Sequence, residues 1–401
     1  MKVTQVYQLL NNAFGEVTGE TDLVLNDLSN VVDIGEKVFS NQELLDKYVA
    51  SLINHIGKVV FVDRPYTGQA PSVLMDGWEY GSILEKISVG LPESKVNETW
   101  GGTGQGLVDG LEYNPNIFRA PPTPRVKFFN AMDTYAIDMS FGRKQVRQSF
   151  SSANQLNAFF SMLEGKVAMR RTIDYDNLIS RTINNMIAGT IYDAYGTDDE
   201  STLASTSKAR AVNLLYLYKQ VNPTATITAQ NCLYNLDFIK FAAYTMALYS
   251  DRLEKASKLF NCGGQVRFTP KSLQKFVMLS EFKKAADVYL QSDTFHNEFT
   301  KLPAAESVTY WQGSGQDYGF SQTSGIHINT KNPNNDNTTI EVATSGILGV
   351  LFDRDALGVN NVENRVYSKF NEVGEFYTNF YKNDARYFND YDENFIVFFV
   401  A

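Results

Sequence analysis

Few residues in this chain are of types that could do chemistry, and their spacing matches no catalytic or metal-binding motif. The three histidines, His55, His296 and His327, lie far apart in the sequence. None stands in a His-Glu-x-x-His arrangement, which places two imidazoles on one helix face to bind zinc. We expect exposed or hydrogen-bonded histidines. The two cysteines, Cys232 and Cys262, are too distant to suggest a disulfide framework, and we expect two small buried, reduced thiols.

Two acidic runs could supply the paired carboxylates that glycoside hydrolysis requires. They are Asp198-Asp199-Glu200 and the group Asp390, Asp392 and Glu393. Each stands in a polar, turn-like context, so we expect solvated charges. A carbohydrate-active enzyme stays open as an alternative, and it predicts a deep pocket with two carboxyl groups about 5–9.5 Å apart.

Two further segments have the composition of ligand-binding loops without their register. The glycine cluster Gly101–Gly106 contains no Gly-x-Gly-x-x-Gly pattern, so we expect a loop tip. Asn332–Glu341 lacks the central glycine and the early carboxylates of a calcium loop, so we expect a surface loop. We therefore assign no catalytic, cofactor-binding or metal-binding residues and expect no cofactor.

Composition bounds the class of protein. A chain of 401 residues with 43% hydrophobic content has room for two or three packed modules. Its net charge of −9 argues against a protein whose main task is to coat nucleic acid. The sequence shows no signal-peptide pattern and no apolar run long enough to cross a bilayer, so we expect a soluble protein without a membrane partner.

The elements that would position these residues are dominated by one long helix. Apolar residues recur at steps of three and four from about residue 152 to 194, which predicts an amphipathic helix roughly 60 Å long. Such a helix exceeds the width of an ordinary core and suggests a spine along an extended subunit.

The segments before the spine differ in character. Residues 1–56 have an amphipathic helical pattern, and residues 58–66 are typical of a strand. Residues 67–124 are rich in glycine and proline around short alternating runs, which predicts a long two-stranded excursion. Because an isolated hairpin is marginal in water, we expect this excursion to need a partner surface.

After the spine, helices and strands alternate without a regular βαβ repeat, which predicts an α+β fold. Residues 196–210 indicate a polar linker. The expected elements are helices over 234–260 and 281–290, strands over 265–268 and 276–279, a buried strand within 343–359, and paired antiparallel strands over the last forty residues.

Four segments, residues 141–183, 268–299, 349–359 and 367–400, carry a further pattern. In this order they resemble the major capsid proteins of tailed bacteriophages, with the Hong Kong-type capsid fold. This resemblance implies an N-terminal arm (1–57), an extended loop (58–140), a peripheral domain with the spine helix (141–205 and 359–390) and an axial domain (206–358 and 391–401).

The resemblance also implies a function. Subunits of this family form hexamers and pentamers in an icosahedral shell around packaged double-stranded DNA. It implies a structural protein of the virion and not an enzyme, assembled in the host cytoplasm with a portal. Many capsid proteins carry a cleaved N-terminal scaffolding segment, but residues 1–57 are short and show no charged coiled-coil pattern, so we expect a separate scaffolding protein. The acidic balance predicts weak DNA contact without sequence specificity. We expect the basic residues to make salt bridges within or between subunits; they are Arg143, Lys144, Arg147, Arg170 and Arg171. The alternative for Arg170 and Arg171 is contact with the DNA.

Two alternatives belong to the same fold. An encapsulin-like nanocompartment shell would enclose cargo enzymes instead of a genome. Some capsids also crosslink neighbouring subunits covalently by an isopeptide bond between a loop lysine and an asparagine, assisted by a glutamate. The residue types are present here as Lys86, Lys95, Asn361, Asn364 and Glu363, but no local motif aligns them.

Overall fold

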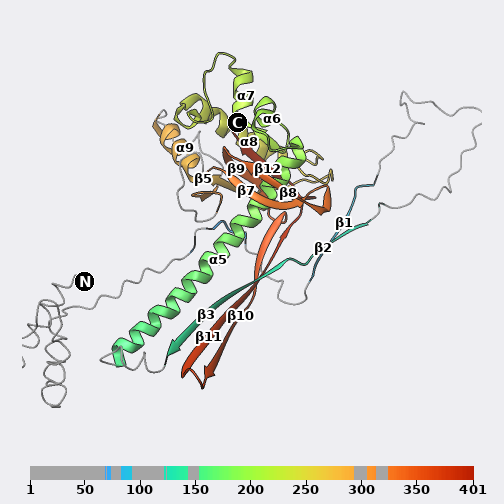
Figure 1. The fold of residues 1–401 in the computed structure, drawn as a ribbon. Coiled ribbons are helices and arrows are strands. Elements are labelled where there is room, and N and C mark those ends of the chain that lie inside the picture. The colour runs from blue at the N-terminus through green and yellow to red at the C-terminus, as the bar shows by residue number, and fades with distance from the viewer. Residues whose placement is uncertain are drawn as a thin grey trace, which may run out of the picture. The chain divides into compact units, whose positions relative to one another are not determined.

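The computed structural model describes residues 68, 70–73, 83–92, 122, 124–142, 153–292, 305–312 and 324–401 (Figure 1). The chain divides into two compact units, residues 1–64 with 158–162, and residues 65–157 with 163–401. The description below concerns the second unit together with residues 158–162, which lie within a helix that continues into it.

Several predictions of the sequence fall outside the described residues. They concern the helices within 1–56, the strand over 58–66, the glycine cluster and the residues His55, Lys95, Arg143, Lys144, Arg147 and His296.

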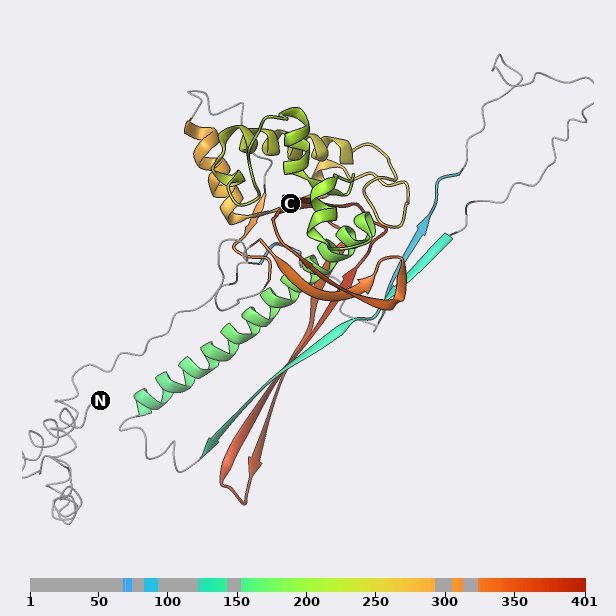
Figure 2. The same ribbon diagram turned by 45° about the horizontal axis from the view of Figure 1, so that its top comes forward.

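The predicted spine is confirmed as helix α5, Ala153–Tyr195, which is 43 residues long. Its C-terminal part is buried: Ile183, Met186 and Ile187 are at most 1% exposed. In Figures 1 and 2 the helix runs beside the strands β3, β10 and β11. Two hydrogen bonds join it to β11, from Tyr175 Oη to Asn383 Oδ1 (2.8 Å) and from Asn389 Nδ2 to the Thr182 carbonyl (2.7 Å).

The strands beside α5 form a three-stranded antiparallel sheet in the order β10-β11-β3. Its strands are β3 (Met132–Gly142), β10 (Leu357–Asn371) and β11 (Phe376–Asn389). The first four residues of β10 are buried, and most of the strand beyond Asn360 is exposed. The antiparallel pairing predicted near the C-terminus is thereby confirmed.

A second sheet of five strands holds the main core, in the order β4-β12-β9-β5-β6. Its strands are β4 (Ala211–Asn213), β5 (Gln274–Leu279), β6 (Glu306–Val308), β9 (Ile347–Asp353) and β12 (Phe395–Phe399). All residues of β9 and β12 are buried, as their continuous apolar runs require. β9 is the buried strand that the sequence predicted.

Helices complete this core. They are α6 (Glu200–Ser205), α7 (Leu214–Val221), α8 (Leu236–Leu253) and α9 (Ser280–Ser292), with short 3₁₀ turns η1 (Cys232–Tyr234) and η2 (Lys271–Leu273). Asparagine side chains cap two of them: Asn213 accepts from the Tyr216 N–H and Asn235 from the Phe238 N–H. α8 and α9 correspond to the predicted helices, so the α+β fold class is confirmed.

Three local predictions were wrong. Residues 265–268 form no strand but only an isolated bridge between Ser257 and Arg267, because the Asn261 side chain closes a turn onto Gln265. Residues 332–341 are not a loop: they belong to a hairpin of β7 (Ile326–Asn332) and β8 (Asn335–Thr344). The supposed linker 196–210 contains α6, whose Leu203 is 2% exposed.

Candidate functional site: a charge cluster beneath an exposed apolar ribbon

The strands β1 (Leu84–Val89) and β2 (Pro124–Phe129) form a separate two-stranded antiparallel ribbon. The register places Lys86 opposite Lys127 and Ile87 opposite Val126. Because side chains alternate between the two faces of a strand, the two lysines lie on one face and the two aliphatic residues on the other. Like charges directly opposite each other destabilise a strand pair, so the lysines require anionic partners.

Those partners come from the segment between β11 and β12. Lys86 Nζ lies 2.8 Å from Asp390 Oδ2, and Lys127 Nζ lies 3.1 Å from Asp390 Oδ1. A single carboxylate therefore bridges the two lysines. Lys127 also lies 2.7 Å from Asp392 Oδ2, and Lys86 donates to the Asp355 carbonyl at 2.8 Å. We call this group the root cluster; its members are Lys86, Lys127, Asp355, Asp390, Asp392, Glu393 and Arg267.

The root cluster corrects the prediction of solvated acids. Asp390 is 3% exposed and Asp392 is 7% exposed. The two residues lie in a tight turn between β11 and the buried strand β12, and that position carries their side chains inward. Ion pairing with the ribbon offsets the cost of burying them. The Asp390 partners are 263 and 304 residues away along the chain, which is why no local pattern reveals them.

This environment shifts the pKa values of two carboxylates in the root cluster in opposite directions. Burial by itself would raise the pKa of Asp390, but Lys86 and Lys127 outweigh it and hold that pKa below its ordinary value. Burial raises the pKa of Glu393 above its ordinary value despite Arg267 and Lys86 nearby. The pKa of Lys127 is raised, because Asp390 and Asp392 together overcome the effect of its burial.

An aromatic contact fixes the same inner face of the ribbon. Phe129 packs on Phe388 of β11 with ring centroids 5.4 Å apart, and Lys86 Nζ lies 5.4 Å from the centroid of that Phe388 ring. The ammonium is thus held over an aromatic face as well as by a carboxylate. The ribbon is anchored through charge and aromatic packing together.

The outer face of the ribbon is apolar and open to solvent. We call Ile87, Val89, Val126 and Phe128 the exposed ribbon face, and their exposures are 65%, 58%, 43% and 65%. An ordinary amphipathic ribbon buries such residues and exposes its lysines. Here the arrangement is inverted. Contiguous exposed apolar residues of this kind mark a contact surface.

The remaining predicted residues lie apart from this site. The exposed His327 ring lies 2.6 Å from Glu341, as expected for a hydrogen-bonded surface histidine. Cys232 and Cys262 are both free thiols; Cys232 is fully buried and Cys262 partly so. Burial raises the pKa of Cys232 to about 11 and also raises that of Cys262, so both stay neutral near pH 7.

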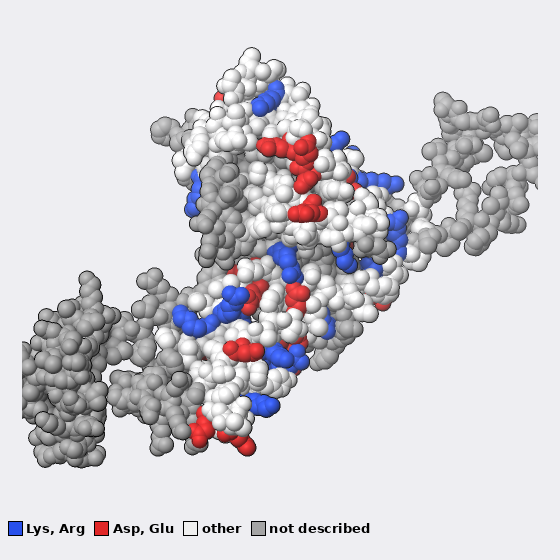
Figure 3. Space-filling view, viewed as in Figure 1, with Lys and Arg blue, Asp and Glu red and all other residues white. Residues whose placement is uncertain are grey.

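Of the two α5 arginines considered for salt bridges, Arg170 makes the expected ion pair within the subunit, whereas Arg171 contacts an aromatic ring. Arg170 pairs with Asp174 one turn along, at 3.0 Å, and Arg171 lies over the Tyr381 ring, 5.7 Å from its centroid. On the face drawn in Figure 3, basic and acidic side chains are interspersed over the lower part of the view. A phosphate-binding surface normally has a denser basic patch.

The residues considered for a covalent crosslink are not brought together within the described part of the subunit. Lys86 contacts Asp390 and the Asp355 carbonyl, whereas Glu363 Oε2 lies 3.7 Å from Arg365 Nε. Asn361 and Asn364 lie in β10, on either side of a shift in its register with β11.

The other acidic run lies around the start of α6. Asp199 accepts from the Thr202 N–H as the N-cap, and Asp198 accepts from the Ala343 N–H at 2.9 Å. Asp199 and Glu200 are exposed, which confirms the expectation for these two residues.

Among the described residues no group of three or more His, Cys, Asp or Glu could hold a metal ion. No helix in that same part of the chain is long and apolar enough to cross a membrane.

Comparison with solved structures finds a match that shows the same fold. The chain matches a chain in the structure of head fiber and inner core protein gp22 of native bacteriophage P68, with a TM-score of 0.52, 8% identity, and 86% of this chain and 88% of that chain covered. The capsid of Staphylococcus phage Andhra gives a TM-score of 0.49 at 10% identity, with 86% and 87% covered. The capsid of the cyanophage P-SCSP1u gives 0.44 at 9% identity, with 86% and 91% covered. At such identities the first match shows the fold alone. No curated protein matches the sequence.

The family assignment comes from the sequence itself. A family model described as Phi29-like phage major capsid protein matches residues 10–399. It favours a phage capsid over the cargo-enclosing shell that the sequence left open. Since that match spans nearly the whole chain, the protein belongs to the Phi29-like phage major capsid protein family and is a subunit of a bacteriophage capsid shell.

Proposed function

We propose that this capsid subunit forms hexamers and pentamers of an icosahedral shell around double-stranded DNA, and that the exposed ribbon face is one of its contacts with a neighbouring copy. The inverted ribbon carries the proposal. Its lysines are held by buried carboxylates of the same subunit, so its apolar face is directed to solvent.

The energetics favour a partner for this face. Burying one large aliphatic or aromatic side chain contributes about 1.5–3 kcal/mol, so the four residues of the exposed ribbon face supply a substantial drive toward association. A neighbouring copy is the partner that a shell always provides. The root cluster makes the ribbon rigid at its base, which lowers the entropy that such a contact costs.

The finer organisation follows the same proposal. Residues 1–57 serve as an N-terminal arm and 58–140 as an extended loop. Residues 141–205 with 359–390 form a peripheral domain, and 206–358 with 391–401 an axial domain. The subunit acts as a structural component of the virion and not as an enzyme. It assembles in the host cytoplasm with a separate scaffolding protein and a portal.

DNA contact in this proposal is weak and independent of sequence. The net charge of −9 opposes strong phosphate binding, Arg170 pairs with Asp174, and Arg171 lies over the Tyr381 ring. The shell encloses its DNA mainly as a closed container.

Matched serine substitutions test the proposed contact. Phe128→Ser removes an aromatic side chain from the exposed ribbon face, and Phe268→Ser removes one that is equally exposed elsewhere, at 61% against 65%. Both variants should retain the melting temperature of the free subunit. We expect the Phe128 variant to fail to form shells in electron micrographs and the Phe268 variant to assemble. Normal assembly of the Phe128 variant, in yield and particle size, would contradict the proposal.

A further inference from the structure

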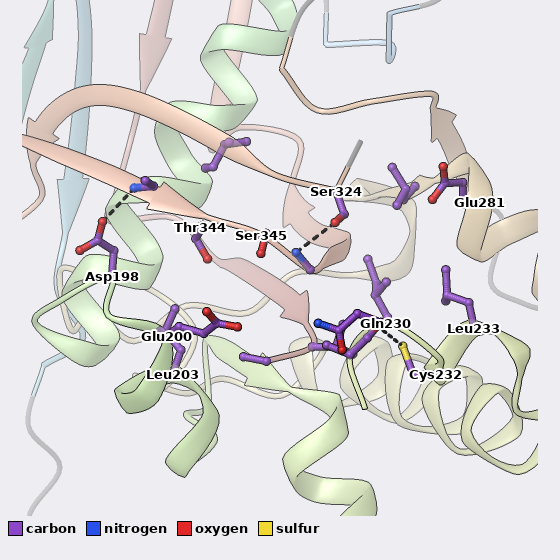
Figure 4. Close-up of a pocket in the computed structure, with 18 residues that line it drawn as sticks. Asp198, Glu200, Leu203, Gln230, Cys232, Leu233, Glu281, Ser324, Thr344 and Ser345 are labelled. Carbon is purple, nitrogen blue, oxygen red and sulfur yellow. Dashed lines mark hydrogen bonds between the residues drawn. The ribbon is translucent and has the colours of Figure 1, made fainter. Parts of the chain in front are cut away.

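A cavity lies where several segments distant in sequence meet, and its lining shares no residue with the root cluster (Figure 4). Its volume is about 340 Å³. The lining comes from the start of α6, the turn η1, the start of α9, the end of β8 and the residues after β12. That size is at the small end of the range for sites that bind small molecules.

The walls of the cavity are apolar. Leucine and valine side chains with little exposure of their own line it: Leu203, Leu233, Leu279, Leu348 and Val400. Cys232 adds a thiol, which donates to the Ala229 carbonyl at 3.2 Å. Burial raises the pKa of this thiol to about 11, so it stays uncharged and extends the apolar wall.

Carboxylates stand at two sides of this apolar space. In Figure 4, Asp198 and Glu200 lie on one side and Glu281 lies on the other. None of the described residues that line the cavity is a lysine, arginine or histidine. The lining therefore offers negative charge to a ligand, and it disfavours an anion.

A buried hydroxyl points to a ligand independently of the acids. Thr344 is 9% exposed, and its Oγ1 has no hydrogen-bond partner among the described residues. Figure 4 shows this oxygen on the cavity side of β8. A buried polar atom without a partner costs about 1–3 kcal/mol, and a bound donor would remove that cost.

We propose that this cavity binds an alkylammonium ligand, specifically a short linear aliphatic diamine. Its methylene chain would lie on the leucine and valine walls. One ammonium group would face Asp198 and Glu200, and the other would face Glu281. Each ammonium has three donors and no acceptor, so the Thr344 hydroxyl suits it as an additional acceptor. A cation with an apolar stem matches both the walls and the charges of the site.

Calorimetric titration of the purified full-length subunit tests this site with 1,4-diaminobutane as the probe and n-butylamine as the comparison. We expect saturable binding of one diamine per subunit, tighter than that of the monoamine. Glu281→Gln should weaken diamine binding by about fivefold or more, as the loss of a partly buried ion pair of roughly 1 kcal/mol implies. Glu200→Gln should weaken it in the same direction.

The matched control is Glu254→Gln, which removes the same charge from the exposed C-terminal end of α8. It should leave the affinity unchanged, whereas Thr344→Val should lower it. The absence of saturable binding would overturn the proposal. Equal weakening by the Glu281 and Glu254 substitutions would also overturn it, because that result would reflect only the general attraction of amines to an acidic protein.

A second arm separates two sources of the same chemistry. A lysine side chain from a neighbouring copy would present one ammonium on an apolar stem and would occupy the cavity only in the shell. Persistence of diamine binding in assembled shells supports a free ligand. Loss of binding on assembly, with retention by the free subunit, would overturn the free ligand as the natural occupant and assign the site to a neighbour's lysine.

Discussion

At the scale of single residues, the buried Asp390 carboxylate bridges two opposed lysines, and Asp392 adds a second negative charge beside Lys127. The Asp390 side chain is 4% exposed, while those of Lys86 and Lys127 are 25% and 38% exposed. Two ammonium groups on one ribbon face would repel each other without it. Asp390 thus determines which face of the ribbon turns inward and which turns to solvent.

Asp390→Asn should lower the free energy of unfolding by about 2–4 kcal/mol at neutral pH, because it leaves two half-buried ammonium groups without their shared charge. The pKa of Asp390 lies below its ordinary value of 3.8 in the folded state. Its contribution is therefore fully present above that value and is lost as the pH falls through the folded pKa. Denaturant titrations at several pH values measure the difference from the wild type.

Glu393→Gln is the internal control for this effect. The pKa of Glu393 is raised above its ordinary value of 4.5. Its carboxyl group therefore binds a proton more tightly in the folded state than in the unfolded state, and its negative charge does not stabilise the fold. The glutamine variant mimics the protonated form and should not be destabilised at neutral pH. A pH-independent loss in the Asp390 variant, or an equal loss in both, would contradict this account of the cluster.

Backbone geometry at Gly346 gives a second residue-scale prediction. This glycine has φ 78°, and an added Cβ would stand 2.0 Å from the Val400 carbonyl oxygen. Gly346→Ala should cost about 2–4 kcal/mol of stability, since strain and a backbone clash combine.

Gly264 offers the comparison for Gly346, since its φ is 62° and an added Cβ would meet no atom within 4 Å. Gly264→Ala should cost only about 1–2 kcal/mol, the cost of the left-handed conformation alone. Thermal unfolding distinguishes the two variants, and equal shifts in melting temperature would show that the contact with Val400 is unimportant.

At the scale of elements, α5 is one helix with two environments. Between 178 and 191 most side chains are buried, whereas between 163 and 177 only Val167 and Asp174 are. A helix derives most of its stability from packing of its apolar face, so the two halves should differ in local stability.

Hydrogen exchange of the free subunit should therefore show strong amide protection over 178–191 and faster exchange over 163–177. In assembled shells we expect residues 163–177 to gain protection, because neighbouring copies would cover them. Mass spectrometry of proteolytic fragments measures both states. Uniform protection along α5 in the free subunit would contradict the assignment of its stability to the buried half.

Sequence periodicity predicted the elements whose apolar residues recur at the spacing of a helix or a strand within the element itself. The spine predicted over 152–194 is α5, because its apolar stripe repeats over many turns. β9 was predicted from a continuous apolar run, and β10 with β11 from alternation. The hairpin of β7 and β8 was missed, because the asparagine-rich segment 332–341 resembles loop composition although its strands pair on a two-residue turn.

The site was predictable only in part, for a physical reason. The sequence singled out Asp390, Asp392 and Glu393 as acids, but solvation was the wrong environment for Asp390 and Asp392. Burial depends on Lys86 and Lys127, which approach from a distant ribbon. Alternation within 84–89 and 124–129 does separate charged from apolar residues, but it does not indicate which face turns inward.

At the scale of the whole molecule, family membership makes this chain a capsid shell subunit, and the ribbon indicates how one contact of that shell is built. Anything that binds only the folded subunit stabilises it, and a neighbouring copy is such a ligand. We therefore expect assembled particles to unfold at a higher temperature than free subunits, by an amount that depends on protein concentration in the measurement. Calorimetry of the two forms measures this difference, and identical transitions would argue against mutual stabilisation.

The measurement that tests the central claim most directly is cryo-electron microscopy of particles formed when the chain is expressed with its neighbouring genes. The account predicts closed shells of hexamers and pentamers in which Ile87, Val89, Val126 and Phe128 are buried against an adjacent copy, while Asp390 still bridges Lys86 and Lys127. A shell in which this apolar face remains open to solvent would contradict the account.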